Sequence, residues 1–182
     1  PSAAPTRGSC VSFARRLSTL DHLSRGRIAW NIVTSFQASA WRNLGHDDVR
    51  KHLARYEQAE EYVTVIYKLL EGSWEDEAVV RDRANRVFAD PEKIHEIHHK
   101  GEYYSVPGIH TNEPSPQRVP VLFQAGSSDD GRTFAARNAE AMFIAAENPR
   151  GAKILIDDIQ RRLEKNGRLT SDLLIFQYLN II

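Results

Sequence analysis

The chain has 182 residues, of which 41% are hydrophobic and 26% charged, with 24 Lys and Arg balancing 24 Asp and Glu. This composition and a mean hydropathy of −0.47 fit a folded globular protein and argue against a disordered chain. No run reaches the roughly 18 to 20 apolar residues of a membrane-spanning helix, and zero net charge leaves no basic footprint for nucleic acid.

The first patterned elements are a predicted helix and a predicted strand. Apolar residues at spacings of four, three and three predict one face of a helix, namely Phe13, Leu17, Leu20 and Leu23. Residues 27–35 are then nearly all apolar and β-branched, over the length of one strand. Because the apolar residues do not alternate cleanly, we expect a strand buried on both faces, as in a parallel sheet.

A long helix is the most clearly patterned element of the chain. It follows a polar loop expected over 37–45, and Asp47 and Asp48 are available to cap its first turn. One helical face carries the apolar side chains until Gly72 ends the helix, and these are Val49, Leu53, Tyr56, Ala59, Val63, Ile66 and Leu70.

The rest of the chain alternates strands and helices after one long irregular segment. That segment, at about 73–118, is rich in prolines, tyrosines and histidines, and a stretch this long between a helix and a strand is more often functional than idle. Strands are then expected at 119–125, 141–146 and 173–180, with helices ending near Asn138 and running from Asn148-Pro149 to Asn166-Gly167. Four strands separated by helices predict βα units and an α/β sheet.

Two candidate sites lie where α/β folds place their chemistry, at the carboxyl ends of strands. At the end of the first strand, Asn31, Thr34 and Ser35 bring an amide and two hydroxyls, for which capping of the strand and turn is the simpler reading. At 124–128, small residues and serines precede a helix, so backbone amides and hydroxyls could cradle a phosphate.

Two observations weigh against a phosphate at 124–128. Ser127 or Ser128 could act as a simple N-cap, and Asp129 and Asp130 would repel a dianion unless they point away. From spacing alone the two readings are equally good.

His52 and Tyr56 form a third candidate, because residues four apart lie on one side of a helix and their rings could meet a single ligand. A buried tyrosine beside a surface histidine is the commoner outcome of this spacing. His95-Glu96-Ile97-His98-His99 matches the H-E-x-x-H zinc pattern, which requires a helix. The match closely follows Asp90-Pro91 and has no evident third ligand, so we expect no metal site.

Several long phrases resemble the flavin-dependent monooxygenases of the bacterial-luciferase-like superfamily. They are residues 13–24 (FARRLSTLDHLS), 26–35 (GRIAWNIVTS), 67–76 (YKLLEGSWED), 113–126 (EPSPQRVPVLFQAG) and 131–137 (GRTFAAR). The similarity runs from about Phe13 to Ile182. It points to the branch of nitrilotriacetate monooxygenase component A and dibenzothiophene-sulfone monooxygenase.

The resemblance implies a partial TIM (β/α)8 barrel, with about four βα units and the long insertion as a lid or substrate wall. It implies an enzyme that uses reduced FMN and O2 to oxidise a small organic substrate, with the reduced flavin supplied by a separate NAD(P)H-dependent reductase. His52 and Tyr56 match the family's flavin contacts, and Ser128, with Ser127 beside it, matches the serine that meets the FMN phosphate. Asn31 and Thr34 would line the same rim, and no catalytic residue is assigned.

Further expectations concern the chain as a whole. A TIM barrel takes about 250 residues, so over 1–182 we expect one luciferase-like monooxygenase domain with an incomplete barrel and an insertion at about 73–118. Open sheet edges favour a homo-oligomer. The alternative to an active enzyme is a catalytically inactive flavin-binding or interaction remnant. Because Cys10 is the one cysteine and the N-terminus lacks a signal-like apolar core, we expect a reducing, cytoplasmic compartment.

Overall fold

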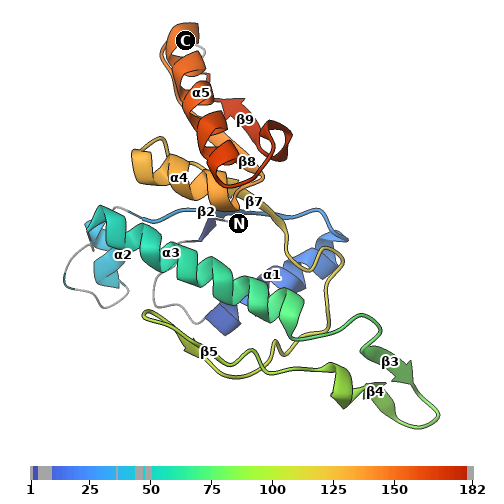
Figure 1. Cartoon of the computed structure of the whole chain (residues 1–182). Helices are drawn as coiled ribbons and strands as arrows, with labels where there is room; N and C mark the ends of the chain where they lie inside the picture. Colours follow the sequence, from blue (N-terminus) through green and yellow to red (C-terminus); the bar gives the residue numbers. More distant parts are fainter. Residues whose placement is uncertain (1, 4–9, 36, 44–46, 48–50, 180–182) are drawn as a thin grey trace. The chain divides into compact units, whose positions relative to one another are not determined.

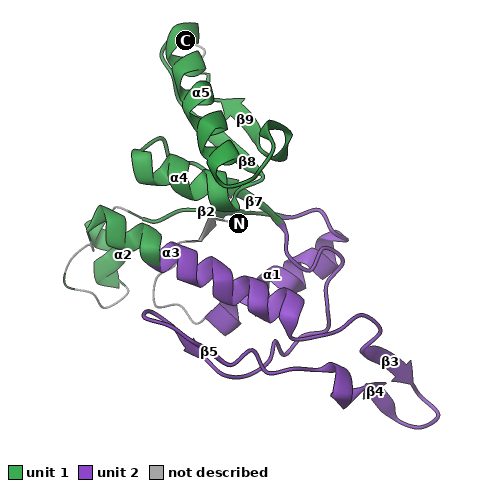
Figure 2. Cartoon of the chain, viewed as in Figure 1, with its two compact units in different colours: residues 1–6, 29–57, 121–182 green, residues 7–28, 58–120 purple. Residues whose placement is uncertain are grey.

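The structure, a computed structural model, describes residues 2–3, 10–35, 37–43, 47 and 51–179. The chain divides into two compact units, coloured separately in Figure 2. Unit 1 comprises residues 1–6, 29–57 and 121–182, and unit 2 comprises residues 7–28 and 58–120. The single domain expected over 1–182 stays a prediction, and each unit is described by itself.

Unit 1 is built on a five-stranded parallel sheet (Figure 1). Its strands, in spatial order, are β1 (Ser2–Ala3), β2 (Ala29–Ile32), β7 (Val121–Gln124), β8 (Ala141–Ile144) and β9 (Leu174–Gln177). The spatial order of these five strands is the same as their order along the chain. A doubly wound sheet differs, because its strand order reverses direction at one point in the sheet. This one-directional order is that of a barrel wall, so the predicted α/β class and its four strands are confirmed, and β1 is an additional fifth strand.

The helices of the α/β alternation also match the expected pattern, with one exception. They are α3 (His52–Tyr67), α4 (Asp129–Asn138) and α5 (Pro149–Lys165). Asp48 and Val49, predicted as a cap and as the first apolar position of the long helix, lie outside the described residues. The polar loop expected over 37–45 was wrong in part, because α2 (Ala38–Asn43) forms there and buries Trp41, whose Nε1 donates to the Ser35 carbonyl at 3.1 Å.

Helices α4 and α5 bury one face of the sheet. Side chains from both helices pack with those of β8 and the start of β9 in a cluster of Ala135, Ala136, Ala139, Met142, Ile144, Ile159, Leu163 and Leu173. In β2, buried and half-exposed residues alternate: Trp30 and Ile32 are buried, whereas Ala29 and Asn31 are half-exposed.

The opposite face of the sheet carries a row of aromatic rings. Phe143 and Phe176 are in register, and their ring centroids lie 5.5 Å and 6.2 Å respectively from that of Phe123. Phe143 is 41% and Phe176 43% exposed. The expectation that the strand at 27–35 is buried on both faces is therefore wrong for the described residues, because Ala29 and Asn31 of β2 are half-exposed.

Unit 2 contains α1 (Cys10–Ser24), the remainder of α3 and the irregular segment. The helix predicted over Phe13–Leu23 is confirmed as α1, and Phe13 packs against Tyr62 of α3 with ring centroids 5.8 Å apart. A π-helical turn (Lys68–Gly72) extends α3. The insertion then forms two short antiparallel hairpins, β3 (Val79–Asp82) with β4 (Val87–Ala89), and β5 (His99–Lys100) with β6 (Ser105–Val106).

Glu61 of α3 anchors the second hairpin. Its Oε1 accepts from His99 Nε2 at 3.0 Å and from the Tyr104 amide at 2.8 Å, and its Oε2 accepts from the Tyr103 amide at 2.9 Å. An added Cβ at Gly101 would lie 2.1 Å from Glu61 Oε1, so a side chain at this position would displace the carboxylate from its hydrogen bonds. Burial opposes ionisation, but these hydrogen bonds hold the pKa of Glu61 below its usual range.

Candidate functional site

The turn between β7 and α4 exposes the amino end of a helix. Ser128 has extended backbone geometry, and its Oγ accepts from the Gly131 amide at 3.1 Å, so Ser128 is the N-cap of α4. The first amides of an α-helix have no acceptor within the helix, so those of Asp129 and Asp130 point out of its end. The N-cap reading of the sequence is therefore confirmed, and the amides and the exposed hydroxyls of Ser127 and Ser128 still form a donor set suited to an anion.

Two glycines allow this turn to pack closely. A Cβ added at Gly126 would lie 2.7 Å from Gln124 Nε2 and 2.9 Å from the Tyr56 hydroxyl oxygen. A Cβ added at Gly131 would lie 2.7 Å from the Gly126 carbonyl oxygen and 2.9 Å from the same hydroxyl. Both glycines thus let the turn lie against the Tyr56 hydroxyl, and at Gly131 an added side chain would require a shift of the backbone at Gly126.

His52 and Tyr56, at the start of α3, meet this turn. Their ring centroids lie 5.1 Å apart, and Tyr56 is buried, with its ring 5.7 Å from that of Phe134 on α4. His52 is exposed, and its Nδ1 donates to Asp130 Oδ2 at 2.6 Å. The structure therefore brings together His52, Tyr56, Ser127 and Ser128, four of the six residues predicted for the cofactor.

Basic side chains offset the acidic first turn of α4. Asp129 Oδ1 pairs with Arg162 Nη2 at 2.5 Å and with Arg132 Nη2 at 3.3 Å, while Asp130 pairs with His52. Both arginines also bind Asp158 of α5, from Arg132 Nε at 2.7 Å and from Arg162 Nε at 2.8 Å. The repulsion of an anion expected from the sequence is thus reduced by two arginines, and Asp130 is engaged by His52 at the same helix end.

A cavity of about 340 Å³ lies at the carboxyl ends of β2 and β7, within the size range of ligand pockets. It is lined by Ile32, Val33, Thr34, Ser35, Gln37, Tyr56, Gln124 and Ala125. Thr34 and Tyr56 therefore line one cavity, and the role of Thr34 toward a cofactor stays a prediction. Asn31 is not part of this lining, because it lies on the other face of β2, in register with Phe123, and its role stays a prediction.

The histidine cluster of the insertion does not have the geometry of the zinc pattern. Residues 95–98 are not helical, and His99 begins β5. His95 donates to Glu75 at 2.6 Å, whereas His99 donates to Glu61. Within the described part of the chain, no group of three His, Cys, Asp or Glu side chains is placed to hold a metal ion.

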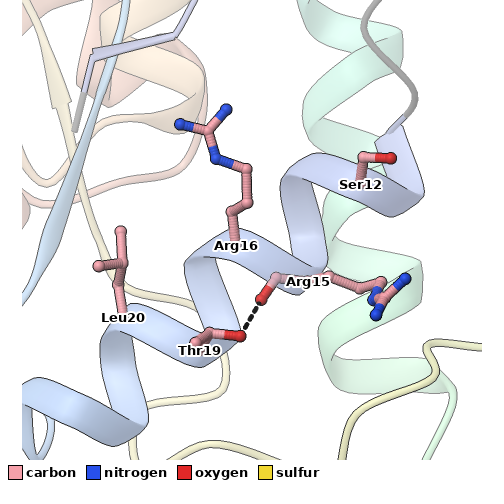
Figure 3. A pocket seen from close by; sticks show the side chains of 5 residues that line it. All are labelled: Ser12, Arg15, Arg16, Thr19 and Leu20. Carbon is pink, nitrogen blue, oxygen red and sulfur yellow. Dashed lines mark hydrogen bonds between the residues drawn. The ribbon is translucent and has the colours of Figure 1, made fainter.

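A larger pocket of about 490 Å³ lies on α1 in unit 2 (Figure 3). Its lining residues are Ser12, Arg15, Arg16, Thr19 and Leu20, and the Thr19 hydroxyl donates to the Arg15 carbonyl at 2.8 Å. All five side chains come from one helix. Among the described residues that line it there is no strand end, no glycine and no aromatic side chain such as Tyr56, so this pocket lacks the combination that makes the turn before α4 a candidate site.

Sequence reasoning missed Arg132, Asp158 and Arg162 as parts of this region. Their signal was weak, because all three lie on helix positions where charged residues are usually just solvated. The spacing of Asp158 and Arg162, four apart on α5, indicates an ion pair but not its second link to α4.

Residues 4–182 match the family model described as luciferase-like monooxygenase, and the chain therefore belongs to this family. Long-chain alkane monooxygenase of Geobacillus thermodenitrificans is 51% identical over 93% of this chain and 38% of its own length. Dimethyl-sulfide monooxygenase of Hyphomicrobium sulfonivorans is 53% identical over 93% of this chain and 35% of its own length. Nitrilotriacetate monooxygenase component A of Aminobacter aminovorans, at 39% identity over 94% of this chain and 38% of its own, confirms the predicted branch.

Solved structures extend this relationship to the fold. A crystal structure of long-chain alkane monooxygenase, 49% identical, matches 97% of this chain and 41% of its own with a TM-score of 0.93. A structure of riboflavin lyase with modified FMN and riboflavin, 37% identical, matches 97% of this chain and 39% of its own with a TM-score of 0.91. The chain thus spans 35 to 38% of the length of these three curated relatives, as expected for part of a barrel.

Proposed function

We propose that this chain forms the FMN-phosphate-binding part of an FMN-dependent monooxygenase. The observation that carries the proposal is the convergence of Tyr56, His52 and the serine-capped amino end of α4 on one turn of unit 1. Family membership and the FMN named in the riboflavin lyase structure support flavin as the ligand. The family's name supports oxygen insertion as the reaction.

The residues of the turn fit a phosphate group. Ser127 and Ser128 offer hydroxyl donors, and the α4 amides add donors together with the positive end of the helix dipole. Gly126 and Gly131 let the turn lie close against the Tyr56 hydroxyl. The carboxylates nearby are paired with arginine and histidine, so they are less able to oppose a dianion.

The cavity beside the turn provides room for the rest of the ligand. Tyr56 of α3 lies against the turn and also lines the cavity, so a ligand held by its phosphate at Ser128 would extend past the Tyr56 hydroxyl toward Thr34 and Gln124. His52 would stand at the exposed edge of the phosphate, fixed by Asp130. Reduced FMN, when bound, supplies the electrons that activate O2 for oxidation of a small organic substrate.

The partners follow from this chemistry and remain proposals. Reduced flavin must be produced elsewhere, and the name "component A" of the nitrilotriacetate relative supports a separate NAD(P)H-dependent reductase. The exposed aromatic face of the sheet supports a homo-oligomer.

None of the helices in the described residues is long and apolar enough to cross a membrane. We place the enzyme in the cytoplasm, where the free, buried Cys10 fits a reducing environment.

Two measurements test the proposal. Quenching of flavin fluorescence gives the Kd values of FMN and of riboflavin, which lacks the phosphate, and we expect FMN to bind at least tenfold more tightly. Equal affinities would contradict a phosphate site at the turn. In a second measurement, the complex with reduced FMN is mixed with oxygenated buffer. Reoxidation at the rate of free flavin, despite tight FMN binding, would favour the inactive flavin-binding remnant.

A further inference from the structure

Arg132 links the proposed phosphate turn to the neighbouring helix α5. Its Nη1 donates to the Ser127 carbonyl, its Nη2 reaches Asp129 at 3.3 Å, and its Nε donates to Asp158 Oδ2 at 2.7 Å. The side chains of Arg132 and Asp158 are only 18% and 20% exposed. One planar guanidinium therefore ties three points together: the turn, the first residue of α4 and the middle of α5.

Asp158 holds this guanidinium in place. Its Oδ2 also accepts from Arg162 Nε at 2.8 Å, and Arg162 in turn pairs with Asp129, so two acids and two arginines close a ring across α4 and α5. Burial works against ionisation of Asp158, but the hydrogen bonds from Arg162 and Arg132 hold its pKa below the usual range. A ring of this kind fixes side-chain rotamers more firmly than an isolated surface pair does.

We propose that Arg132, locked by Asp158, is a positioning residue that sets the Ser127–Ser128 turn in the geometry that receives the FMN phosphate. This inference rests on the proposed function. With its carbonyl held by Arg132, the Ser127 peptide cannot rotate, so the neighbouring Ser128 amide and hydroxyl keep a fixed direction at the helix end. Arg132 acts through the turn and needs no contact with the phosphate.

Long-range charge is the competing explanation, because removal of any arginine near an anion site weakens anion binding. The arrangement of the guanidinium donors of Arg132 allows the charge explanation and the positioning explanation to be tested separately. A lysine at position 132 keeps the charge, but a single ammonium cannot donate in three directions from one plane as a guanidinium does. Arg132→Lys therefore preserves the electrostatic contribution and removes the positioning.

The experiment compares FMN and riboflavin affinities of the 182-residue protein with those of its Arg132→Gln, Arg132→Lys and Asp158→Asn variants. Riboflavin reports the rest of the flavin site without the phosphate, and thermal unfolding followed by circular dichroism reports the fold. Lys153→Gln is the matched control, because Lys153 is an exposed cation of α5 that pairs with Asp157 at 3.1 Å.

We expect all three test variants to lose at least fivefold of the preference for FMN over riboflavin, with riboflavin affinity within twofold of wild type and Lys153→Gln unchanged. Retention of the preference by Arg132→Lys would show that charge alone is needed and would overturn the positioning role. Equal losses of FMN and riboflavin affinity would assign Arg132 to the fold alone and would overturn it too. If the wild-type protein shows no preference, the phosphate site itself fails, and the proposed function fails with it.

Discussion

Two glycines occupy equivalent positions in two helices of unit 1, and we predict opposite effects of replacing them with alanine. Gly131 is the third residue after the N-cap Ser128 of α4, and Gly151 is the third residue after the N-cap Asn148 of α5. Both amides donate to the cap side chain, at 3.1 Å and 2.9 Å. The helix propensity gained by Gly→Ala is therefore similar at the two sites, about 0.5–1 kcal/mol.

The surroundings of the two glycines differ. At Gly151 the nearest atoms to an added Cβ are Asn148 Oδ1 at 3.6 Å and Ala146 Cβ at 3.8 Å, which are ordinary contacts. At Gly131 the nearest atom is the Gly126 carbonyl oxygen at 2.7 Å, which is backbone and cannot rotate away. Overpacking of this kind costs about 1–3 kcal/mol, so we expect Gly151→Ala to stabilise by about 0.5 kcal/mol and Gly131→Ala to destabilise by about 1–2 kcal/mol.

Thermal unfolding of the two variants beside wild type measures this difference. A gap of about 2 kcal/mol corresponds to about 4–8 °C in Tm for a protein of this size, with Gly131→Ala below wild type and Gly151→Ala above it. The same displacement of the turn should weaken FMN binding by Gly131→Ala and leave it unchanged in Gly151→Ala. If both variants were stabilised alike, the close packing of the turn against Tyr56 and α4 would be refuted.

Three further predictions address the cap, the insertion and the open face. Ser128→Ala should lose about 1 kcal/mol of stability in a denaturant titration, whereas Ser128→Asp should keep the cap, and hence the stability, but lose the preference for FMN. Glu61→Gln should cost about 2 kcal/mol, and because the folded pKa of Glu61 is depressed, its contribution is present above the usual value of 4.5 and disappears as the pH falls through the lower folded pKa. Acid titration of the wild type should therefore show a loss of stability that the variant lacks, and parallel curves would argue against the anchor. Phe143→Ser should reduce concentration-dependent self-association in light scattering, because Phe143 is 41% exposed on the aromatic face.

The spacing of apolar residues along the sequence was sufficient to predict most of the helices and strands of unit 1. The strands at β2, β7, β8 and β9 and the helices α3, α4 and α5 each carry a run of apolar residues long enough to show their spacing. Two elements of unit 1 were not predicted, because they are too short for a spacing of apolar residues to be recognised. β1 pairs two residues with β2, and α2 buries one tryptophan in six residues, so neither shows a repeat.

The site was predictable in its parts but not in its connections. The spacing of His52 and Tyr56 predicts adjacent rings, and Ser128 before an acidic turn predicts a cap, both of which the structure has. The ion pair of His52 with Asp130 joins residues 78 apart in sequence, and local patterns carry no information on such pairs. The exposure of the Phe123 face could not be predicted either, because near-continuous apolar runs are typical of strands that are covered on both faces.

The central claim is that the turn before α4 receives the phosphate of FMN. Amide chemical shifts of the isotope-labelled protein, followed while FMN, riboflavin or inorganic phosphate is added, test this claim most directly. We predict that FMN and inorganic phosphate shift the amides of Gly126 to Asp130, and that riboflavin leaves them in place. Shifts at the α1 residues Arg15 and Arg16 with FMN, and none at the turn, would contradict the account.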